Sequence, residues 1–191
     1  MRALVNEYFQ SRRLSVKIIA ICLTRNDADI LPRTVRDAAS WCDHIIIVNH
    51  DSSDDTERVA RDLERECKGV IFFGTVSGAY SNGIRSLAYK RYSHLANSND
   101  WWCRLDSDEI YFDDPRQFLS DVPRYYRSVA GIGLQFYFTQ NDLELYKEKP
   151  ENYLGGECVH SLKYFNCIVF FSYFMSCLVY LSNRSRTYYF Q

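Results

Sequence analysis

The sequence predicts an α/β fold with a mostly parallel sheet and helices on both faces. Over roughly the first 110 residues, short apolar runs alternate with segments whose apolar residues recur at helical spacing. The runs begin roughly 25–30 residues apart, which is the size of a β-α-β unit. Few polar residues interrupt them, as expected for strands that are buried on both faces of a sheet.

Each expected strand is an apolar run that ends in polar residues, and a helix is expected between each pair. A short helix and a further strand are expected after the fourth strand. The third helix is expected to bury Leu87 among its inward-facing residues. The expected strands are 16–23, 44–48, 69–73, 101–105 and 129–138. The first expected helix is 29–41, with Asp29 as N-cap, and the second contains residues 59–67 and is capped by Ser53 or Asp54. The third is 82–95, and the fourth is a short helix that starts at 113–115.

Composition places the chain among ordinary globular proteins. Its 191 residues suit one domain, with 47% hydrophobic and 25% charged residues. A net charge of −1 gives no reason to expect nucleic acid or an anionic membrane as the main partner. We expect a lead-in over 1–15, a domain over 16–165 and an atypical apolar and aromatic tail over 166–191.

The 7 cysteines form no C-x-x-C pair and lie mostly in apolar runs. They are therefore expected to be reduced core residues in a cytoplasmic protein, and no zinc site is expected. No apolar stretch of the kind found in a secretory signal precedes Ser15. The apolar run 164–181 is about as long as the shortest membrane span, about 18 residues, but its composition also suits buried strands. Peripheral membrane contact therefore stays open as an alternative.

Three polar clusters follow expected strands, at residues 24–27, 49–56 and 106–109. In parallel α/β sheets, ligands bind outside the carboxyl ends of the strands. The coincidence of all three clusters with such ends predicts a binding site there.

The third of these clusters contains Asp106 and Asp108, two residues apart. In an extended segment, positions two apart point to the same side, so the two carboxylates are expected to converge. Mg²⁺ and Mn²⁺ take one or two protein carboxylates together with substrate phosphates. We therefore expect a divalent metal here; the alternative is a solvated acidic turn after a strand.

No G-x-G-x-x-G follows the first strand, and no P-loop follows any strand. A nucleotide site in this sheet would then be built from side chains and a metal instead of a glycine-rich loop. A metal that bridges diphosphate oxygens also stabilises charge on a leaving diphosphate. That chemistry suits group transfer from a nucleotide-diphosphate donor.

Residues 16–26, 45–56 and 105–109 together resemble the family 2 glycosyltransferases, and the resemblance covers about residues 16–140. It implies the A-type glycosyltransferase fold, which is Rossmann-like, and sugar transfer from a nucleotide-diphosphate-sugar donor to an acceptor hydroxyl with inversion. The acceptor would be a saccharide or a lipid-linked molecule. The resemblance also implies a set of donor-binding positions. These are Thr24, Arg25, Asn26, Asn49, His50, Asp54, Arg85 and Glu109, with Asp106 and Asp108 as metal-binding and catalytic residues.

Two of these positions carry an open alternative: Asp54 as an N-terminal helix acid and Arg85 as a solvated helix arginine. Family members usually carry an acid at or beside position 49, where this chain has Asn49-His50, so the base preference stays open.

Beyond residue 166 the resemblance ends, which suggests a chain truncated after its donor-binding half. The candidate catalytic bases are Asp142, Glu144, Glu157 and His160. Two rival functions remain: a non-catalytic remnant that binds nucleotide-sugar only, and a metal-dependent nucleotidyl- or phosphotransferase.

Overall fold

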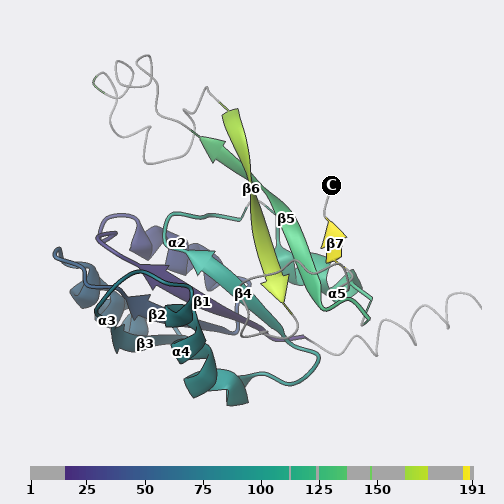
Figure 1. Ribbon diagram of the computed structural model, residues 1–191, viewed down its shortest axis with the longest axis horizontal. Coiled ribbons are helices and arrows are strands. Elements are labelled where there is room, and N and C mark those ends of the chain that lie inside the picture. Colours follow the sequence, from purple (N-terminus) through teal and green to yellow (C-terminus); the bar gives the residue numbers. More distant parts are fainter. Residues whose placement is uncertain are drawn as a thin grey trace, which may run out of the picture. The chain divides into compact units, whose positions relative to one another are not determined.

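The computed structural model describes residues 16–111, 113–123, 125–136, 147, 162–171 and 187–189 (Figure 1). The chain forms two compact units. The first contains residues 1–128 and 170–187, and the second contains residues 129–169 and 188–191. The candidate site lies wholly within the first unit.

The first unit is built on four parallel strands in the order β3-β2-β1-β4 (Figure 1). This confirms the predicted α/β fold with its parallel sheet. The carboxyl ends of neighbouring strands are level, since Thr24 pairs with Asn49 and Leu23 pairs with Asp106. The strands are β1 (Ile18–Thr24), β2 (His44–Asn49), β3 (Val70–Thr75) and β4 (Trp101–Asp106).

The two central strands form the core of the unit. All seven residues of β1 are buried, and so are five of the six in β2. Helices on both faces exclude water from such strands, which accounts for their uninterrupted apolar sequences. Each fully buried aliphatic side chain contributes about 1.5–3 kcal/mol of transfer free energy.

Helices α2 (Leu31–Ala38) and α3 (Thr56–Glu66) connect β1 to β2 and β2 to β3, while α4 (Gly83–Tyr92) leads from β3 to β4. Because β4 lies on the opposite side of β1 from β2, the chain reverses direction across the sheet before it enters β4. Right-handed crossovers then place α2 and α3 on one face and α4 on the other (Figure 1). Ile84 and Ala88 of α4 pack on Ile19, Ile21 and Trp102 accordingly.

Helix boundaries differ slightly from those expected. The N-cap residue of α2 is Ile30 instead of Asp29, with a proline in the first turn, and α4 ends at Tyr92 before a 3-10 turn (Ser93–Leu95). The expectation for Leu87 is wrong, because its exposed fraction is 47%. The buried stripe of α4 includes Arg85, which rotates that stripe away from Leu87.

The short helix α5 (Pro115–Asp121) begins as expected, with Asp114 accepting a hydrogen bond from the backbone N–H of Arg116. The Arg116 guanidinium donates to the carbonyls of Val16 and Trp41 and to Asp43. Helix α5 is thereby attached to the segments that precede β1 and β2.

The second unit contains most of β5 (Ser128–Phe136) and β6 (Leu162–Phe171), and the end of β7 (Thr187–Tyr189), in the order β6-β5-β7. The first part of the apolar run 164–181 is thus strand; the rest lies outside the described residues. Within the described part of the chain, no helix is long and apolar enough to cross a bilayer.

Candidate functional site

A pocket of about 380 Å³ opens at the carboxyl ends of β1 and β4. These two strands are neighbours, but the chain passes through β2 and β3 between them, so the pocket lies at a topological switch point of the sheet. The predicted position of the site, at the strand ends, agrees with the pocket. Its walls come from the ends of β1 and β4, from four loops and from α4. The lining residues are Leu23, Thr24, Arg25, Asp27, His50, Tyr80, Arg85, Asp106, Ser107 and Asp108.

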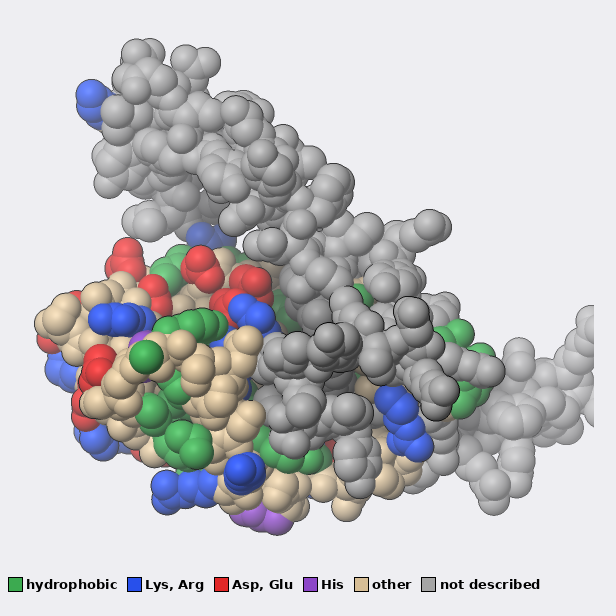
Figure 2. Space-filling model, viewed as in Figure 1, with side chains coloured by type: hydrophobic (Ala, Val, Ile, Leu, Met, Phe, Trp, Pro, Cys, Tyr) green, Lys and Arg blue, Asp and Glu red, His purple; other side chains and the backbone are tan. Residues whose placement is uncertain are grey.

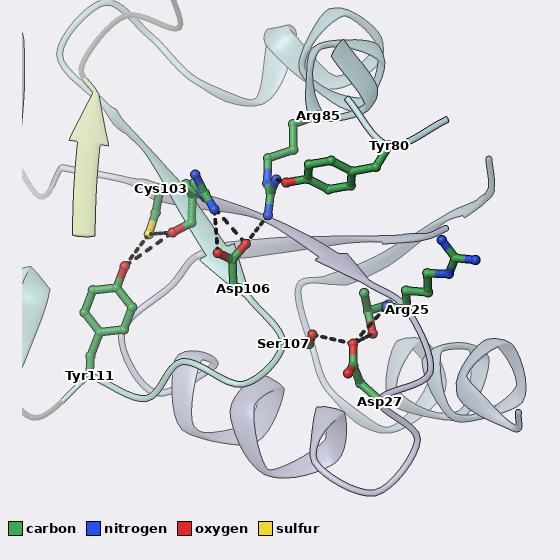
Figure 3. A network of polar contacts seen from close by, with 10 residues as sticks. Arg25, Asp27, Tyr80, Arg85, Cys103, Asp106, Ser107 and Tyr111 are labelled. Atoms are coloured by element: carbon green, nitrogen blue, oxygen red, sulfur yellow. Dashed lines mark hydrogen bonds and ion pairs between the residues drawn. The ribbon is translucent and has the colours of Figure 1, made fainter. Parts of the chain in front are cut away.

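Asp27 joins the loop after β1 to the loop after β4. One carboxylate oxygen, Oδ2, accepts hydrogen bonds from the Thr24 hydroxyl at 2.8 Å, the Arg25 backbone N–H at 2.8 Å and the Ser107 hydroxyl at 2.6 Å. The Ser107 carbonyl in turn accepts from the buried Thr34 hydroxyl of α2 at 2.6 Å. These contacts fix Ser107, the residue between the two acids (Figure 3).

The sequence reasoning placed Asp27 in a polar cluster but gave it no role. Its only local signal is an acid three residues after a strand-ending threonine, near enough along the chain to accept a hydrogen bond from the threonine hydroxyl. The contact with Ser107, 80 positions further along the chain, gives no such local signal.

Asp106 ends β4 and forms ion pairs with two arginines, Arg85 and Arg104. Arg85, on α4, is buried, and its Nη1 lies 3.5 Å from the Tyr80 hydroxyl. Arg104 reaches Asp106 Oδ2 with Nη2 at 2.7 Å. Figure 3 shows Arg85 and Tyr80 turned towards Asp106, while Asp27 and Ser107 form a separate cluster. The solvated-arginine alternative for Arg85 is therefore wrong.

Asp108 lines the same pocket but differs from Asp106 in its surroundings. Strand β4 ends at Asp106, so Asp108 lies in the following turn and the alternation of an extended segment does not reach it. Its side chain is exposed, and it makes no hydrogen bond or ion pair within the described part of the chain. Its carboxylate is therefore free to bind a ligand.

Glu109 does not line the pocket, although its backbone N–H bonds to the Asp106 carbonyl at 3.1 Å. Burial raises the pKa of the Glu109 carboxyl, and the nearby negative charge of Asp106 raises it further.

The loop before α4 is fastened to the end of β2. His50 Nε2 lies 2.8 Å from the Gly78 carbonyl, and Asp51 accepts from the Ser77 hydroxyl and the Gly78 backbone N–H. These hydrogen bonds lower the pKa of the Asp51 carboxyl. The His50 ring packs edge-on against Tyr80, with ring centroids 6.0 Å apart. Both residues belong to the pocket wall, and Tyr80 is 59% exposed.

Besides Glu109, three predicted site residues do not line the pocket: Asn26, Asn49 and Asp54. Asn26, with a φ of 56°, accepts from the Ser53 backbone N–H at 2.7 Å. Asn49 donates to the Thr75 hydroxyl at 2.9 Å. All three connect the loops at the strand ends to one another.

Asp54 accepts from the Thr56 backbone N–H at 3.0 Å and from the Ala28 N–H at 3.2 Å. The hydrogen bond from the Thr56 hydroxyl is the main cause of a lowered pKa of the Asp54 carboxyl. These contacts agree with the alternative that Asp54 is an acid at the N-terminus of a helix, because Thr56 is the first residue of α3.

The pocket acids suit a metal that completes its shell with ligand oxygens. Within the described residues, no three His, Cys, Asp or Glu side chains group closely enough to hold an ion by themselves. Asp108 offers a free carboxylate beside the engaged carboxylate of Asp106, and Mg²⁺ and Mn²⁺ accept one or two such ligands. The residues thus fit a metal shared with substrate oxygens. The candidate bases Asp142, Glu144, Glu157 and His160 lie outside the described residues.

On the face shown in Figure 2, acidic and basic side chains of the first unit lie among one another. The charged residues that line the pocket are likewise of both signs: Arg25, Arg85, Asp27, Asp106 and Asp108.

No family model matches the sequence, and a comparison with curated proteins finds no match. Solved structures do resemble the chain. S. aureus TarS has 15% identity and a TM-score of 0.46, covering 61% of this chain and 35% of its own. The mannosyltransferase PcManGT from Pyrobaculum calidifontis, in complex with GDP-Man and Mn²⁺, has 13% identity and a TM-score of 0.47, covering 66% and 41%.

Glucosyl-3-phosphoglycerate synthase from Mycobacterium tuberculosis, in complex with UDP, has 14% identity and a TM-score of 0.46, covering 86% of this chain and 60% of its own. The chain thus spans less than two thirds of the length of each of these three proteins.

Proposed function

We propose that the pocket binds a nucleotide-diphosphate-sugar and that the chain transfers the sugar to an acceptor hydroxyl. The observation that carries this proposal is the meeting of Asp106, Asp108 and the buried Arg85 at the switch point of a parallel sheet. Such a crevice is where α/β folds bind their ligands. A diphosphate needs cations around its oxygens, and two carboxylates allow a metal to supply one of them.

Asp108, with Asp106, would hold Mn²⁺ or Mg²⁺, which supplies positive charge against the diphosphate as it leaves. Arg85 and Arg25 contribute permanently charged guanidinium groups to the same pocket. The Tyr80 ring, exposed at the pocket wall beside His50, offers a flat surface for a base or a sugar.

Acceptor and location form part of the same proposal. The acceptor is a saccharide or lipid-linked hydroxyl, and a base from outside the described residues would take its proton. Cys22, Cys42, Cys67 and Cys103 are free thiols, in keeping with a cytoplasmic protein. Four site residues inferred from the motifs do not line the pocket: Glu109, Asn26, Asn49 and Asp54. The last three are proposed to act by fixing the positions of the loops around it.

Calorimetric titration of UDP and of GDP into the purified chain, with Mn²⁺ and with EDTA, tests the proposal. Binding is expected to be much tighter with Mn²⁺ than with EDTA, and we expect Asp108→Asn to weaken the binding measured with Mn²⁺ at least about ten-fold, because the variant loses a ligand to the cation. Asp113→Asn is the matched control, because Asp113 is an exposed acid outside the pocket. If the Asp108→Asn variant binds the nucleotide as tightly as wild type, the metal-binding role of Asp108 is refuted. If wild type binds neither nucleotide, the proposed site is refuted.

Turnover is a separate question from binding. Release of UDP or GDP from the corresponding nucleotide-sugars, with Mn²⁺ present, should exceed the rate with the Asp108→Asn variant. Metal-dependent binding without any release would favour the non-catalytic alternative. Release of pyrophosphate or a sugar phosphate instead of a nucleoside diphosphate would favour a nucleotidyl- or phosphotransferase.

A further inference from the structure

Asp106 is shared between two positively charged side chains. The exposed fractions of the three side chains are 3% for Arg85, 25% for Asp106 and 44% for Arg104. Arg104 and Asp106 lie two residues apart on β4, so both side chains are on the face of the sheet that α4 covers. One carboxylate thus serves two guanidinium groups, and the cluster carries an excess of one positive charge.

Arg85 has more donors than partners. Its Nη2 pairs with Asp106 and its Nη1 makes a long contact of 3.5 Å with the Tyr80 hydroxyl. Its Nε is buried and has no hydrogen-bond partner among the described residues. A guanidinium has five N–H donors, and leaving a buried one unpaired costs free energy. The arrangement therefore favours an anion with more acceptor oxygens than a single carboxylate.

We propose that Asp106 is a resident anion that occupies the place of a diphosphate on Arg85 and Arg104, and that a diphosphate binds by exchange with it. This inference rests on the proposed function and deepens it. A diphosphate brings more acceptor oxygens and more negative charge than Asp106, so it can satisfy the donors that are unpaired now. The exchange breaks and forms ion pairs only, with no covalent change.

The exchange has a consequence for cations. While both arginines hold Asp106, a divalent cation can reach that carboxylate only by replacing two ion pairs. Once a diphosphate holds the arginines, the carboxylate is free for a cation. Diphosphate and cation therefore bind with positive coupling, each raising the affinity for the other.

The test uses inorganic pyrophosphate in EDTA, measured calorimetrically on wild type, Asp106→Asn and the Asp113→Asn control. Because the substitution removes the competing anion, Asp106→Asn should bind pyrophosphate about five- to ten-fold more tightly than wild type. With Mn²⁺ present the order should reverse, because the variant lacks a cation ligand. If Asp106→Asn binds pyrophosphate in EDTA no more tightly than wild type does, the inference is overturned.

A second variant guards against misfolding of Asp106→Asn, in which the buried Arg85 loses its counter-ion. Arg104→Gln keeps the ion pair between Arg85 and Asp106. It should bind Mn²⁺, with no nucleotide present, about three-fold more tightly than wild type, because one competitor for Asp106 is gone. Unchanged or weaker Mn²⁺ binding by Arg104→Gln would overturn the inference.

These outcomes separate the inference from the proposed function. If wild type binds UDP or GDP with Mn²⁺ but neither variant binds its ligand more tightly than wild type, the nucleotide site is supported and the exchange is refuted. Wild type that binds neither nucleotide removes the proposed function. Pyrophosphate that binds to none of the three proteins removes the inference as well.

Discussion

Replacing Asp27 by alanine should destabilise the first unit by about 3 kcal/mol. The carboxylate accepts three hydrogen bonds through one oxygen, and a hydrogen bond to a charged group contributes about 1.5–3 kcal/mol. Partial solvent access to Asp27 and the non-additivity of shared bonds reduce the sum. The Thr24 and Ser107 hydroxyls, which are 1% and 6% exposed, would also lose their acceptor.

Urea unfolding followed by tryptophan fluorescence measures this change, since all three tryptophans lie in the first unit. A loss of 3 kcal/mol lowers the urea midpoint by roughly 1–3 M. Ser107→Ala alone should cost about 1 kcal/mol, and the double variant should cost about 1 kcal/mol less than the sum of the singles. Additive effects of the two substitutions would refute the bridge between the loops. So would a loss of stability in Asp27→Ala no larger than the roughly 0.5 kcal/mol expected of an Asp113→Ala control.

Three further predictions follow from local contacts. Gly69→Ala should cost about 2 kcal/mol in urea unfolding, because φ is +87° and a Cβ would lie 2.5 Å from the Asp43 carbonyl oxygen. Burial raises the pKa of Cys103 to about 12, so iodoacetamide at pH 8 should leave it unmodified in the native protein by mass spectrometry, and modification there would contradict the burial. The pKa of Glu109 is raised in the folded state, so the folded state holds its proton to higher pH and stability falls as pH rises above the ordinary value of 4.5. Glu109→Gln should therefore be more stable than wild type at pH 7, with a gain that shrinks towards pH 4, and a constant difference across that range would contradict the shift.

The fold of the first unit could be predicted because its signals are local. A strand buried on both faces must be apolar throughout, and β1 and β2 are. The face of a helix that packs on the sheet is harder to predict from sequence, since it also depends on which side chains of the sheet it contacts. Leu87 was assigned inward from spacing alone, whereas Arg85 takes that side because it reaches Asp106. An ion pair 21 positions apart in the chain overrides the apolar periodicity.

The position of the candidate site could also be predicted, because ligands of parallel α/β sheets bind outside the carboxyl ends of the strands, and the pocket opens there. The assignment of individual residues could not, because polar residues at strand ends serve two purposes. Some contact the pocket, as Thr24 and Asp106 do, and others bind neighbouring loops, as Asn26 and Asn49 do. Both kinds have the same composition and the same place in the sequence. Only the pairing of loops far apart in the chain separates them.

The loop contacts and the pocket contacts nevertheless belong to one arrangement. Ser107 lies between the two acids, and Asp27 holds it through a hydrogen bond that no ligand needs to replace. Asp106, its neighbour on the strand side, is held only by ion pairs, which a ligand of higher charge can replace. Asp108, its neighbour on the other side, is not held by any described residue. The backbone of the acidic turn is thus fixed while its two carboxylates stay exchangeable, which is what a site for a metal and a diphosphate requires.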